Sequence, residues 1–252
     1  ESAVSCHAFG DVTAPYPPDL YLAVHDGNPG DVYFYRRACT EGHDVLELGC
    51  GAGRVSCALA ADGLEVVGVE RDPGLLALAP SCGARFVEAE VRRLDLGRRF
   101  DRIIAPYNAL YCALDDEELA DTLARARAHA RDGAILVFDG WSADRFHAEA
   151  DPEALDEPEL VKTVQARGAT WDVYEHSHWD RARQRIDACY RHVPREGGEA
   201  VEATIAQRYL LSDQVAPILS RAGFELLALL GSFDDEAFDE DSEHLVAVGV
   251  AV

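Results

Sequence analysis

The chain has 252 residues, 48% of them hydrophobic, which is enough to bury one large core. Its formal net charge of -23 gives a surface that repels phosphate groups, so we expect no nucleic-acid partner and no anionic membrane partner. A small or cationic partner fits this charge better. The sequence has no apolar run of membrane-spanning length, and residues 1–10 do not resemble a signal peptide, which favours the cytoplasm.

The seven cysteines are scattered along the chain, and none forms a CxxC pair. Because their number is odd and their spacing matches no zinc site, we expect neither a disulfide framework nor a metal centre. Most of them are interpreted as small buried apolar residues.

The first forty residues are rich in proline, glycine and aromatic residues. They are too polar for a core and too aromatic for a disordered tail. Residues 1–42 are therefore expected to form an ordered N-terminal cover segment, with a short helix near residues 32–39.

From residue 44 onward, apolar runs of strand length alternate with helical patterns. We expect strands at residues 45–48, 65–69, 84–89, 102–105 and 134–138. Helices are expected between them at residues 54–61, 75–79 and 116–130. This alternation predicts βαβ units around a parallel sheet.

The pattern changes in the last third of the chain, where residues 170–178, 184–192 and 200–211 read as antiparallel strands without helices between them. Residues 165–211 are therefore expected to be an inserted antiparallel sheet over the active site. Ser212 is expected to cap a helix, and two final strands follow at residues 225–230 and 245–250. The predicted fold is a doubly wound, Rossmann-like α/β domain of residues 43–150 and 212–252, with a seven-stranded, mostly parallel sheet.

The strongest functional signal is a strand that runs into a glycine-rich turn and then into a helix, Val45-Leu46-Glu47-Leu48-Gly49-Cys50-Gly51-Ala52-Gly53-Arg54. Glycines in such a turn let the backbone approach a ligand closely. A dinucleotide-binding turn has the pattern GxGxxG, and Arg54 stands where its third glycine belongs. The turn favours a nucleoside over a dinucleotide, and an ordinary glycine-rich turn is the structural alternative.

Two acidic residues end the next predicted strands. Glu70 lies seventeen residues after Gly53, where α/β nucleoside sites place the acid that accepts the ribose hydroxyls. Glu90 is a candidate acceptor for an adenine amino group, with Val91 packing on the ring. A solvated surface acid is the alternative for both, and it is a stronger alternative for Glu90.

With these residues in place, the sequence resembles the class I S-adenosylmethionine-dependent methyltransferases, whose first motif is an acid followed by glycines in a GxGxG spacing. Residues 44–140 carry this resemblance. The remainder is more loosely similar to a small-molecule subgroup that includes glycine and amino-sugar N-methyltransferases. The resemblance implies a site in which Glu47 lies near the methionine amino group of the cofactor, Glu70 holds the ribose, and Glu90 and Val91 hold the adenine. The other expected cofactor-binding residues are Gly49, Cys50, Gly51, Gly53, Arg54, Arg71, Pro106 and Asn108.

Methyl transfer from a sulfonium is a single in-line displacement, so the protein mainly holds the acceptor dry and aligned, about 3 Å from the methyl carbon. An acceptor that must lose a proton would also need a base, and histidine suits that role near neutral pH. His176 and His178 share one strand face, and Tyr107 directly follows the fourth strand. These three are the candidate catalytic residues, with packing as the alternative for each histidine. The histidine pair has no third ligand at a recognisable spacing, so no metal is expected.

Aromatic and basic residues are candidates for binding the acceptor, because an aromatic face attracts a cation and a guanidinium attracts an anion. The candidates are Tyr16, Tyr21, His25, Tyr33, Tyr111 and Arg208. Packing of the N-terminal segment on the sheet is the alternative for the tyrosines.

The predicted function is transfer of a methyl group from S-adenosylmethionine to a nitrogen or oxygen of a small-molecule metabolite. Two alternatives stay open. One is an NAD-dependent oxidoreductase, which Arg54 weakens, and the other is a protein that binds S-adenosylmethionine without catalysis. The displacement requires no distinctive residue, so the sequence does not name the acceptor. The oligomeric state is open, with a homodimer as one option.

Overall fold

The computed structural model describes residues 15–151 and 153–252, which form two compact units. The unit that we call the parallel-sheet unit contains residues 27–146 and 209–252. The antiparallel-sheet unit contains the described residues up to 26 together with residues 147–208. Within the described ranges, no helix has the length and apolar character needed to cross a membrane.

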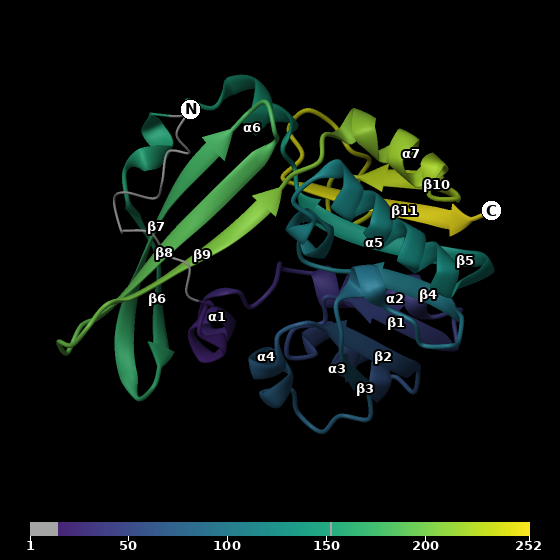
Figure 1. The fold of residues 1–252 in the computed structure, drawn as a ribbon, viewed down its shortest axis with the longest axis horizontal. Coiled ribbons are helices and arrows are strands. Elements are labelled where there is room, and N and C mark those ends of the chain that lie inside the picture. The colour runs from purple at the N-terminus through teal and green to yellow at the C-terminus, as the bar shows by residue number, and fades with distance from the viewer. Residues whose placement is uncertain (1–14, 152) are drawn as a thin grey trace. The chain divides into compact units, whose positions relative to one another are not determined.

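The parallel-sheet unit is built on seven strands in the order β10-β11-β5-β4-β1-β2-β3 (Figure 1). They are β1 (Asp44–Leu48), β2 (Glu65–Glu70), β3 (Arg85–Glu88), β4 (Phe100–Ala105), β5 (Ala130–Trp141), β10 (Phe224–Leu230) and β11 (His244–Ala251). The pairs among β1 to β5 are parallel, and β11 is antiparallel to both of its neighbours. This arrangement confirms the predicted Rossmann-like, mostly parallel sheet.

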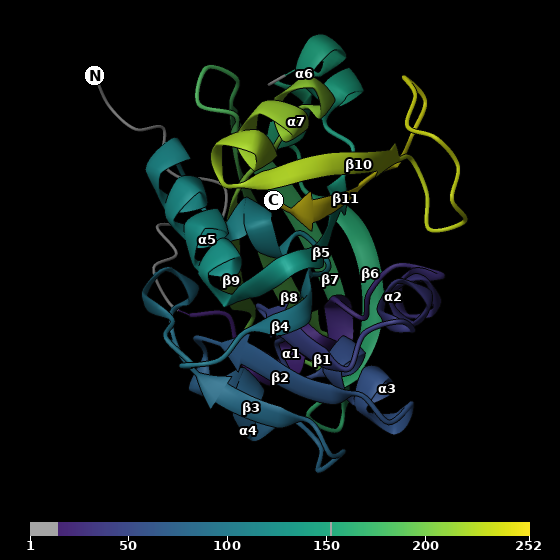
Figure 2. The same ribbon diagram turned by 90° about the vertical axis from the view of Figure 1, so that its right-hand side faces the viewer.

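Helices cover both faces of this sheet, and Figure 2 shows α5 and α7 on one face with α2 and α3 on the other. The helices of the unit are α2 (Asp31–Cys39), α3 (Arg54–Ala61), α4 (Pro73–Ala77), α5 (Asp116–His129) and α7 (Ser212–Arg221), with 3-10 turns η1 (Val91–Arg93) and η2 (Ala109–Cys112). Phe34 and Tyr35 of α2 pack with Val45 and Ile104 of the central strands. Every residue of β1 is buried, as expected of a parallel strand covered on both faces.

Ser212 does not cap α7 as the sequence suggested. It is the first residue of the helix, after Leu211 at the capping position. The Ser212 hydroxyl donates instead to Asp144 Oδ1 at 2.6 Å, at the start of α6 (Asp144–Glu149). The Gln214 side chain accepts the Leu211 N–H at 3.0 Å, so the helix end is satisfied from within its own first turn.

The antiparallel-sheet unit contains four strands in the order β6-β7-β8-β9, where the sequence predicted three. They are β6 (Glu159–Ala166), β7 (Ala169–Asp180), β8 (Arg185–Pro194) and β9 (Val201–Arg208), and a 3-10 turn, η3 (Ala154–Asp156), precedes them. The additional strand, β6, lies at the sheet edge, and Val164 is its one buried residue. Its charged, exposed residues conceal the alternation by which a half-buried strand is recognised.

A short helix that the sequence analysis did not predict, α1 (Pro18–Val24), belongs to the same unit. Its Leu20 packs with Val164, Trp171, Val173 and Tyr190 of the antiparallel sheet. The described N-terminal residues are thus divided between the units, because residues 27–42 group with the parallel sheet. The role of the inserted sheet as a cover over the active site stays a prediction.

A disulfide joins Cys57 of α3 to Cys82, so the expectation that the cysteines form no disulfide is wrong. The two residues are 25 positions apart, and their Cα atoms lie 5.3 Å apart, within the normal range for a disulfide. The pairing depends on how the chain returns past α3 before β3, and the cysteine spacing does not reveal it.

Candidate active site

The glycine-rich turn lies between β1 and α3, and its three glycines adopt a left-handed backbone. Gly49, Gly51 and Gly53 have φ values of 71°, 54° and 82°. A Cβ at Gly53 would lie 2.4 Å from Phe86 Cζ, and one at Gly49 would lie 3.1 Å from the Cβ of Ala109. A Cβ at Gly51 would meet no atom within 4 Å. The turn is therefore tightly packed at both ends and open at its centre, where a ligand can approach the backbone.

Glu70 ends β2 directly beside this turn. Its Oε2 accepts the Gly51 N–H at 3.0 Å, and its Oε1 accepts the N–H groups of Arg71 and Asp72 at 2.8 and 2.9 Å. These hydrogen bonds fix the orientation of the carboxylate. Because a carboxylate has about four acceptor positions and three are used here, Glu70 can still accept a hydroxyl group from a ribose. The open turn and this fixed acid together fit the nucleoside part of S-adenosylmethionine.

Glu90 lies just after β3, at the start of η1. Its Oε1 is 3.4 Å from Arg92 Nε, and its Oε2 is 3.9 Å from Arg71 Nη1. Burial raises the pKa of Glu90, but the hydrogen bonds from Arg92 outweigh it, so the pKa lies below its ordinary value. Glu90 is therefore ionised and held by two arginines, and Val91 follows it as the half-buried first residue of η1.

Glu47 and Arg54 flank the turn with charge. Glu47 is 2% exposed and accepts a hydrogen bond from the Ser56 hydroxyl. Burial raises its pKa to about 7, against the lowering effect of the Ser56 hydrogen bond and the Arg54 charge. Arg54 makes two hydrogen bonds to the buried Asp31 carboxylate, at 2.8 and 2.6 Å. Arg54 is thus already paired with Asp31, and it is not free to pair fully with Glu47.

The turn after β4 contains Pro106, Tyr107 and Asn108. Tyr107 and Asn108 have φ values of 56° and 62°, which non-glycine residues seldom adopt. Asp139 of β5 holds this backbone, because its Oδ1 accepts the Tyr107 N–H at 2.9 Å and its carbonyl accepts the Asn108 N–H at 3.1 Å. The Asn108 side chain in turn accepts the Trp141 N–H at 2.9 Å. An unusual turn fixed in this way at a strand end is typical of a functional site.

Comparisons with known proteins agree with this geometry. Residues 45–133 match a family model described as a methyltransferase domain. The chain is 27% identical to the cypemycin N-terminal methyltransferase of a Streptomyces species, over 82% of this chain and 83% of that protein. It is also 27% identical to the CcbJ methyltransferase of Streptomyces caelestis, whose structure covers 90% of this chain and 98% of its own, with a TM-score of 0.76.

This chain is a class I S-adenosylmethionine-dependent methyltransferase. Its fold is also that of the sugar N-methyltransferase KedS8 from Streptoalloteichus sp ATCC 53650, with a TM-score of 0.74 at 21% identity. That likeness covers 100% of this chain and 97% of the other. Neither the NAD-dependent oxidoreductase nor the non-catalytic binding protein is favoured.

Three further predicted residues lie in the parallel-sheet unit of the methyltransferase. Cys50, in the glycine-rich turn, is 5% exposed, and burial raises the pKa of its thiol. Tyr33, on α2, is 65% exposed. Tyr111 is fully buried, and its hydroxyl donates to the Trp141 carbonyl at 3.0 Å, which is the arrangement of a packing residue.

The predicted acceptor residues Tyr16, Tyr21 and His25 gather in the antiparallel-sheet unit. The rings of Tyr21 and His25 have centroids 4.5 Å apart, and both rings lie near Tyr16. His25 and His192 flank this cluster, with the Tyr16 hydroxyl 2.9 Å from His192 Nε2. Burial lowers the pKa of both histidines to about 4, so both are neutral near pH 7.

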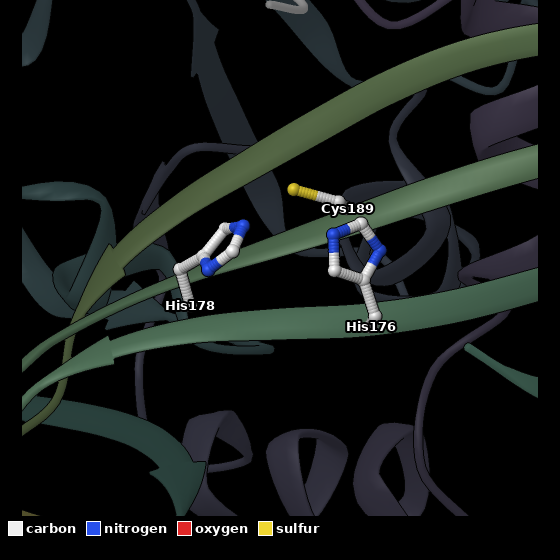
Figure 3. Close-up of side chains that lie close together, drawn as sticks. All are labelled: His176, His178 and Cys189. Atoms are coloured by element: carbon white, nitrogen blue, oxygen red, sulfur yellow. The ribbon is translucent and has the colours of Figure 1, made fainter. Parts of the chain in front are cut away.

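The predicted catalytic histidines lie together with a cysteine in the same unit. Figure 3 shows His176 and His178 of β7 beside Cys189 of β8. Their nitrogen and sulfur atoms lie within 4.8 Å of one another, so the structure adds a cysteine to the histidine pair that the sequence identified. Cys189 is disulfide-bonded, however, so its sulfur is not a free thiolate for a metal ion.

Strand register separates these histidines from the aromatic cluster. In the β7–β8 pair, His176 lies opposite Cys189, whereas Glu175 lies opposite Tyr190. Because neighbouring residues of a strand point to opposite faces, the two predicted sets occupy opposite faces of the antiparallel sheet. Arg208, at the end of β9, is 8% exposed.

Sequence reasoning missed two acids that the structure makes prominent. Asp139 directly follows the predicted strand 134–138, so the strand-end position that identified Glu70 could also have identified Asp139. Glu175 is half-buried on the face that carries Tyr190, and burial raises its pKa against hydrogen bonds from Tyr190 and Ser177. No local sequence pattern distinguishes Glu175 from a solvated strand acid.

Proposed function

We propose that this methyltransferase transfers its methyl group to a nitrogen or oxygen of a small-molecule metabolite, and that the favoured acceptor is an amine. The observation that carries this proposal is the aromatic cluster of the antiparallel-sheet unit, which combines Tyr16, Tyr21, His25 and Tyr190. Aromatic faces attract ammonium groups, by roughly 0.5–2 kcal/mol for each close contact.

Glu175 adds the charge that an amine acceptor would need. It lies opposite Tyr190 in the register and is hydrogen-bonded to that residue. A carboxylate beside aromatic rings favours a cation through both charge and ring contacts. The neutral imidazole of His25, whose pKa is near 4, can accept a hydrogen bond from an amine without repelling it.

The overall charge and the names of similar proteins support the same substrate class. A formal net charge of -23 disfavours nucleic acids, whose phosphate groups are also negative. One of the similar proteins is named as an N-terminal methyltransferase and another as a sugar N-methyltransferase. A nitrogen in a small molecule or short peptide is therefore the first acceptor to test.

In this chemistry the residues of the chain mainly bind the cofactor and align the acceptor with it. When bound, S-adenosylmethionine supplies a methyl group on a positively charged sulfonium. Glu70 would hold the ribose, Glu90 and Val91 the adenine, and Glu47 would lie near the methionine amino group. Cys50, Arg54, Arg71, Pro106 and Asn108 complete the proposed cofactor site. No covalent enzyme intermediate is needed, because alignment and exclusion of water supply the main rate enhancement.

Two proposals compete for the base that removes a proton from the acceptor. In the first, His176 or His178 is the base. In the second, the base or hydrogen-bond acceptor lies on the opposite face, where His25 and Glu175 are. His178→Ala should slow turnover only if the first proposal holds, whereas His25→Ala should do so only if the second holds. The readout is the pH dependence of kcat at saturating cofactor, and the affinity for S-adenosylmethionine should be unchanged in both variants.

The function itself is tested by incubating the protein with S-adenosylmethionine and a panel of small amines, alcohols and short peptides. Formation of S-adenosylhomocysteine together with a mass increase of one methyl group on an amine would support the proposal. The Glu70→Ala variant, at the same concentration, controls for methylation by a contaminating enzyme. Turnover with nucleic acid alone, and with no member of the panel, would contradict it.

A cytoplasmic location is also a proposal, and the disulfide of α3 provides a way to test it. The Cys57–Cys82 disulfide is unusual for that compartment, where thiols are generally kept reduced. Thiol alkylation of the protein immediately after cell lysis tests this point. Full alkylation of Cys57 and Cys82 would show that the bond is open in the cell.

A further inference from the structure

Asp139 is a buried acid that binding of the nucleoside leaves unexplained. It lies near the carboxyl end of β5 and is 1% exposed. Its Oδ1 accepts the Tyr35 hydroxyl at 2.5 Å and the Tyr107 N–H at 2.9 Å. Its Oδ2 is buried and, within the described residues, receives no hydrogen bond. An unsatisfied buried carboxylate oxygen is costly, so its retention calls for a function.

The surroundings of Asp139 carry an excess of negative charge. Asp31, Glu47 and Asp139 are each no more than 2% exposed, and all three act on Tyr35 and raise its pKa, after burial as the main cause. Arg54 is the cation that acts on this group, and it is already hydrogen-bonded through two nitrogens to Asp31. Among the residues that the structure describes, Glu47 and Asp139 are therefore acids without a full countercharge.

This charge lies against the cofactor turn. The backbone that Asp139 holds, at Tyr107 and Asn108, leads directly into Ala109. The Cβ of Ala109 is 3.1 Å from the position that a Cβ on Gly49 would take, so the two turns are in contact. Arg54, which follows the last glycine, places its guanidinium over the Tyr107 ring at 5.8 Å. Asp139 is thus linked to the glycine-rich turn through the Tyr107–Asn108 backbone and Ala109.

We propose that Asp139 is a specificity determinant of the cofactor site, which selects the positively charged S-adenosylmethionine over its product S-adenosylhomocysteine. In the reaction, the carbon–sulfur bond to the methyl group breaks as the acceptor lone pair forms the new bond to that carbon. The electron pair of the broken bond stays on sulfur. The sulfonium thereby becomes a neutral thioether, so the cofactor loses its methyl group and one positive charge, while its nucleoside and its amino-acid amine and carboxylate are unchanged.

A buried negative charge distinguishes these two molecules because the methyl group that one of them carries makes its sulfur positively charged. The Tyr35 hydroxyl and the Tyr107 N–H donate hydrogen bonds to one oxygen of Asp139, and the other oxygen keeps its acceptor capacity. Electrostatic attraction in a buried site is weakly screened, so it acts on a cation without direct contact. The same charge gives no such attraction to the neutral product after methyl transfer.

The test is calorimetric titration of wild-type protein and Asp139→Asn with three compounds. These are S-adenosylmethionine, S-adenosylhomocysteine and sinefungin, in which a protonated amine replaces the sulfonium. We expect Asp139→Asn to lose about tenfold or more in affinity for the two cationic compounds and less than about twofold for S-adenosylhomocysteine. Equal losses for all three compounds, or none, would overturn the proposal, because a purely structural role does not distinguish sulfur charge.

Two controls isolate the charge effect. Asp132→Asn makes the same chemical change on the same strand at an exposed site, and all three affinities should be unchanged. Glu70→Ala should weaken the binding of all three compounds by the same factor, since all three contain the ribose. Failure of the wild-type protein to bind any of the three would overturn the cofactor assignment and this inference with it. The outcome of these titrations does not bear on the proposed amine acceptor, because the titrations contain no acceptor.

A second measurement decides the matter if Asp139→Asn does not fold. Burial raises the pKa of Asp139 to about 6 and that of Glu47 to about 7, with Tyr35, Asp31, Arg54 and the Tyr107 backbone as the other groups that face them. In wild-type protein, the preference for S-adenosylmethionine over S-adenosylhomocysteine should therefore fall as the pH is lowered from 8 to 5. A preference that is constant over this range would overturn the proposal.

Discussion

Burial shifts the pKa of carboxylates beside the cofactor turn and of two histidines in the aromatic cluster of this methyltransferase, and it also raises the pKa of Glu175 next to that cluster. In the parallel-sheet unit the buried groups near the cofactor turn are carboxylates, and burial raises the pKa of Glu47 to about 7 and of Asp139 to about 6. In the antiparallel-sheet unit two imidazoles are shifted in the other direction, and burial lowers the pKa of His25 and His192 to about 4. The cause is the same in both, because burial disfavours whichever form is charged.

The difference teaches what each unit can bind. Near pH 7 the carboxylates are partly or largely ionised, so the parallel-sheet unit keeps a negative charge that attracts a cationic cofactor. The histidines are neutral at that pH and offer hydrogen-bonding nitrogens without charge. Cofactor affinity should depend on the first unit, and acceptor binding on the second.

The largest expected effect comes from removing the disulfide of the parallel-sheet unit. Replacing Cys57 and Cys82 together by Ser should lower the free energy of unfolding by about 3 kcal/mol, since the bond closes a loop of 25 residues. Hydrogen exchange resolved by segment is the measurement, and protection should fall in α3 and β2 more than in the antiparallel sheet. Ser81→Ala is the neighbouring control. Equal loss of protection in both units would show that they unfold together and would remove the basis for separating them.

The next effect concerns the ribose acid. Glu70→Ala should weaken S-adenosylmethionine binding by about 1–3 kcal/mol, because ribose hydroxyls would lose their acceptor. Glu88→Ala, which removes the exposed acid paired with Glu70 in the strand register, should leave the affinity unchanged. Calorimetric titration measures both variants. Unchanged affinity in Glu70→Ala would remove Glu70 from the cofactor site.

A smaller effect is expected in the antiparallel-sheet unit. Tyr16→Phe removes the hydrogen bond to His192 and should cost about 1 kcal/mol of stability. It should also raise the KM for the acceptor, while the Kd for S-adenosylmethionine stays constant. Tyr33→Phe, at a side chain that is 65% exposed, is the control for loss of a hydroxyl. A change in cofactor Kd alone would reverse the assignment of roles to the two units.

The smallest effect is on local stability, which should depend on pH with opposite sign in the two units. The folded-state pKa values of Glu47 and Asp139 lie above their ordinary 4.5 and 3.8, so their stabilising contribution is full at low pH and is lost as the pH rises through 6 to 7. Those of His25 and His192 lie below 6.5, so their contribution is full above 6.5 and is lost as the pH falls toward 4.

Lowering the pH from 8 to 5 should therefore raise hydrogen-exchange protection near β1 and β5 and lower it near α1 and β8, each by on the order of 1 kcal/mol. Exchange rates must be corrected for their intrinsic pH dependence. Glu47→Gln should abolish part of the change near β1 without altering that near β8. A shift of the same sign in both regions would contradict the comparison.

The amino-acid sequence by itself determined the parallel-sheet unit and the position of its cofactor turn. Alternating strand and helix patterns are local, and the positions of Gly49, Gly51 and Gly53 follow directly from the strand before them. The carboxyl ends of parallel strands meet at one sheet edge, so the position of Glu70 beside the turn also follows from chain order.

Only the tertiary structure decided which distant residues meet. The Tyr35–Asp139 hydrogen bond joins positions 104 residues apart, and the disulfide joins Cys57 to Cys82 across a helix and a loop. Strand register decided that His176 and Tyr190 occupy opposite faces. The edge strand β6 and the helix α1 were missed because charged or short segments carry little periodic signal. Local patterns specify elements, whereas these contacts depend on how whole elements pack, and no short window of sequence contains that information.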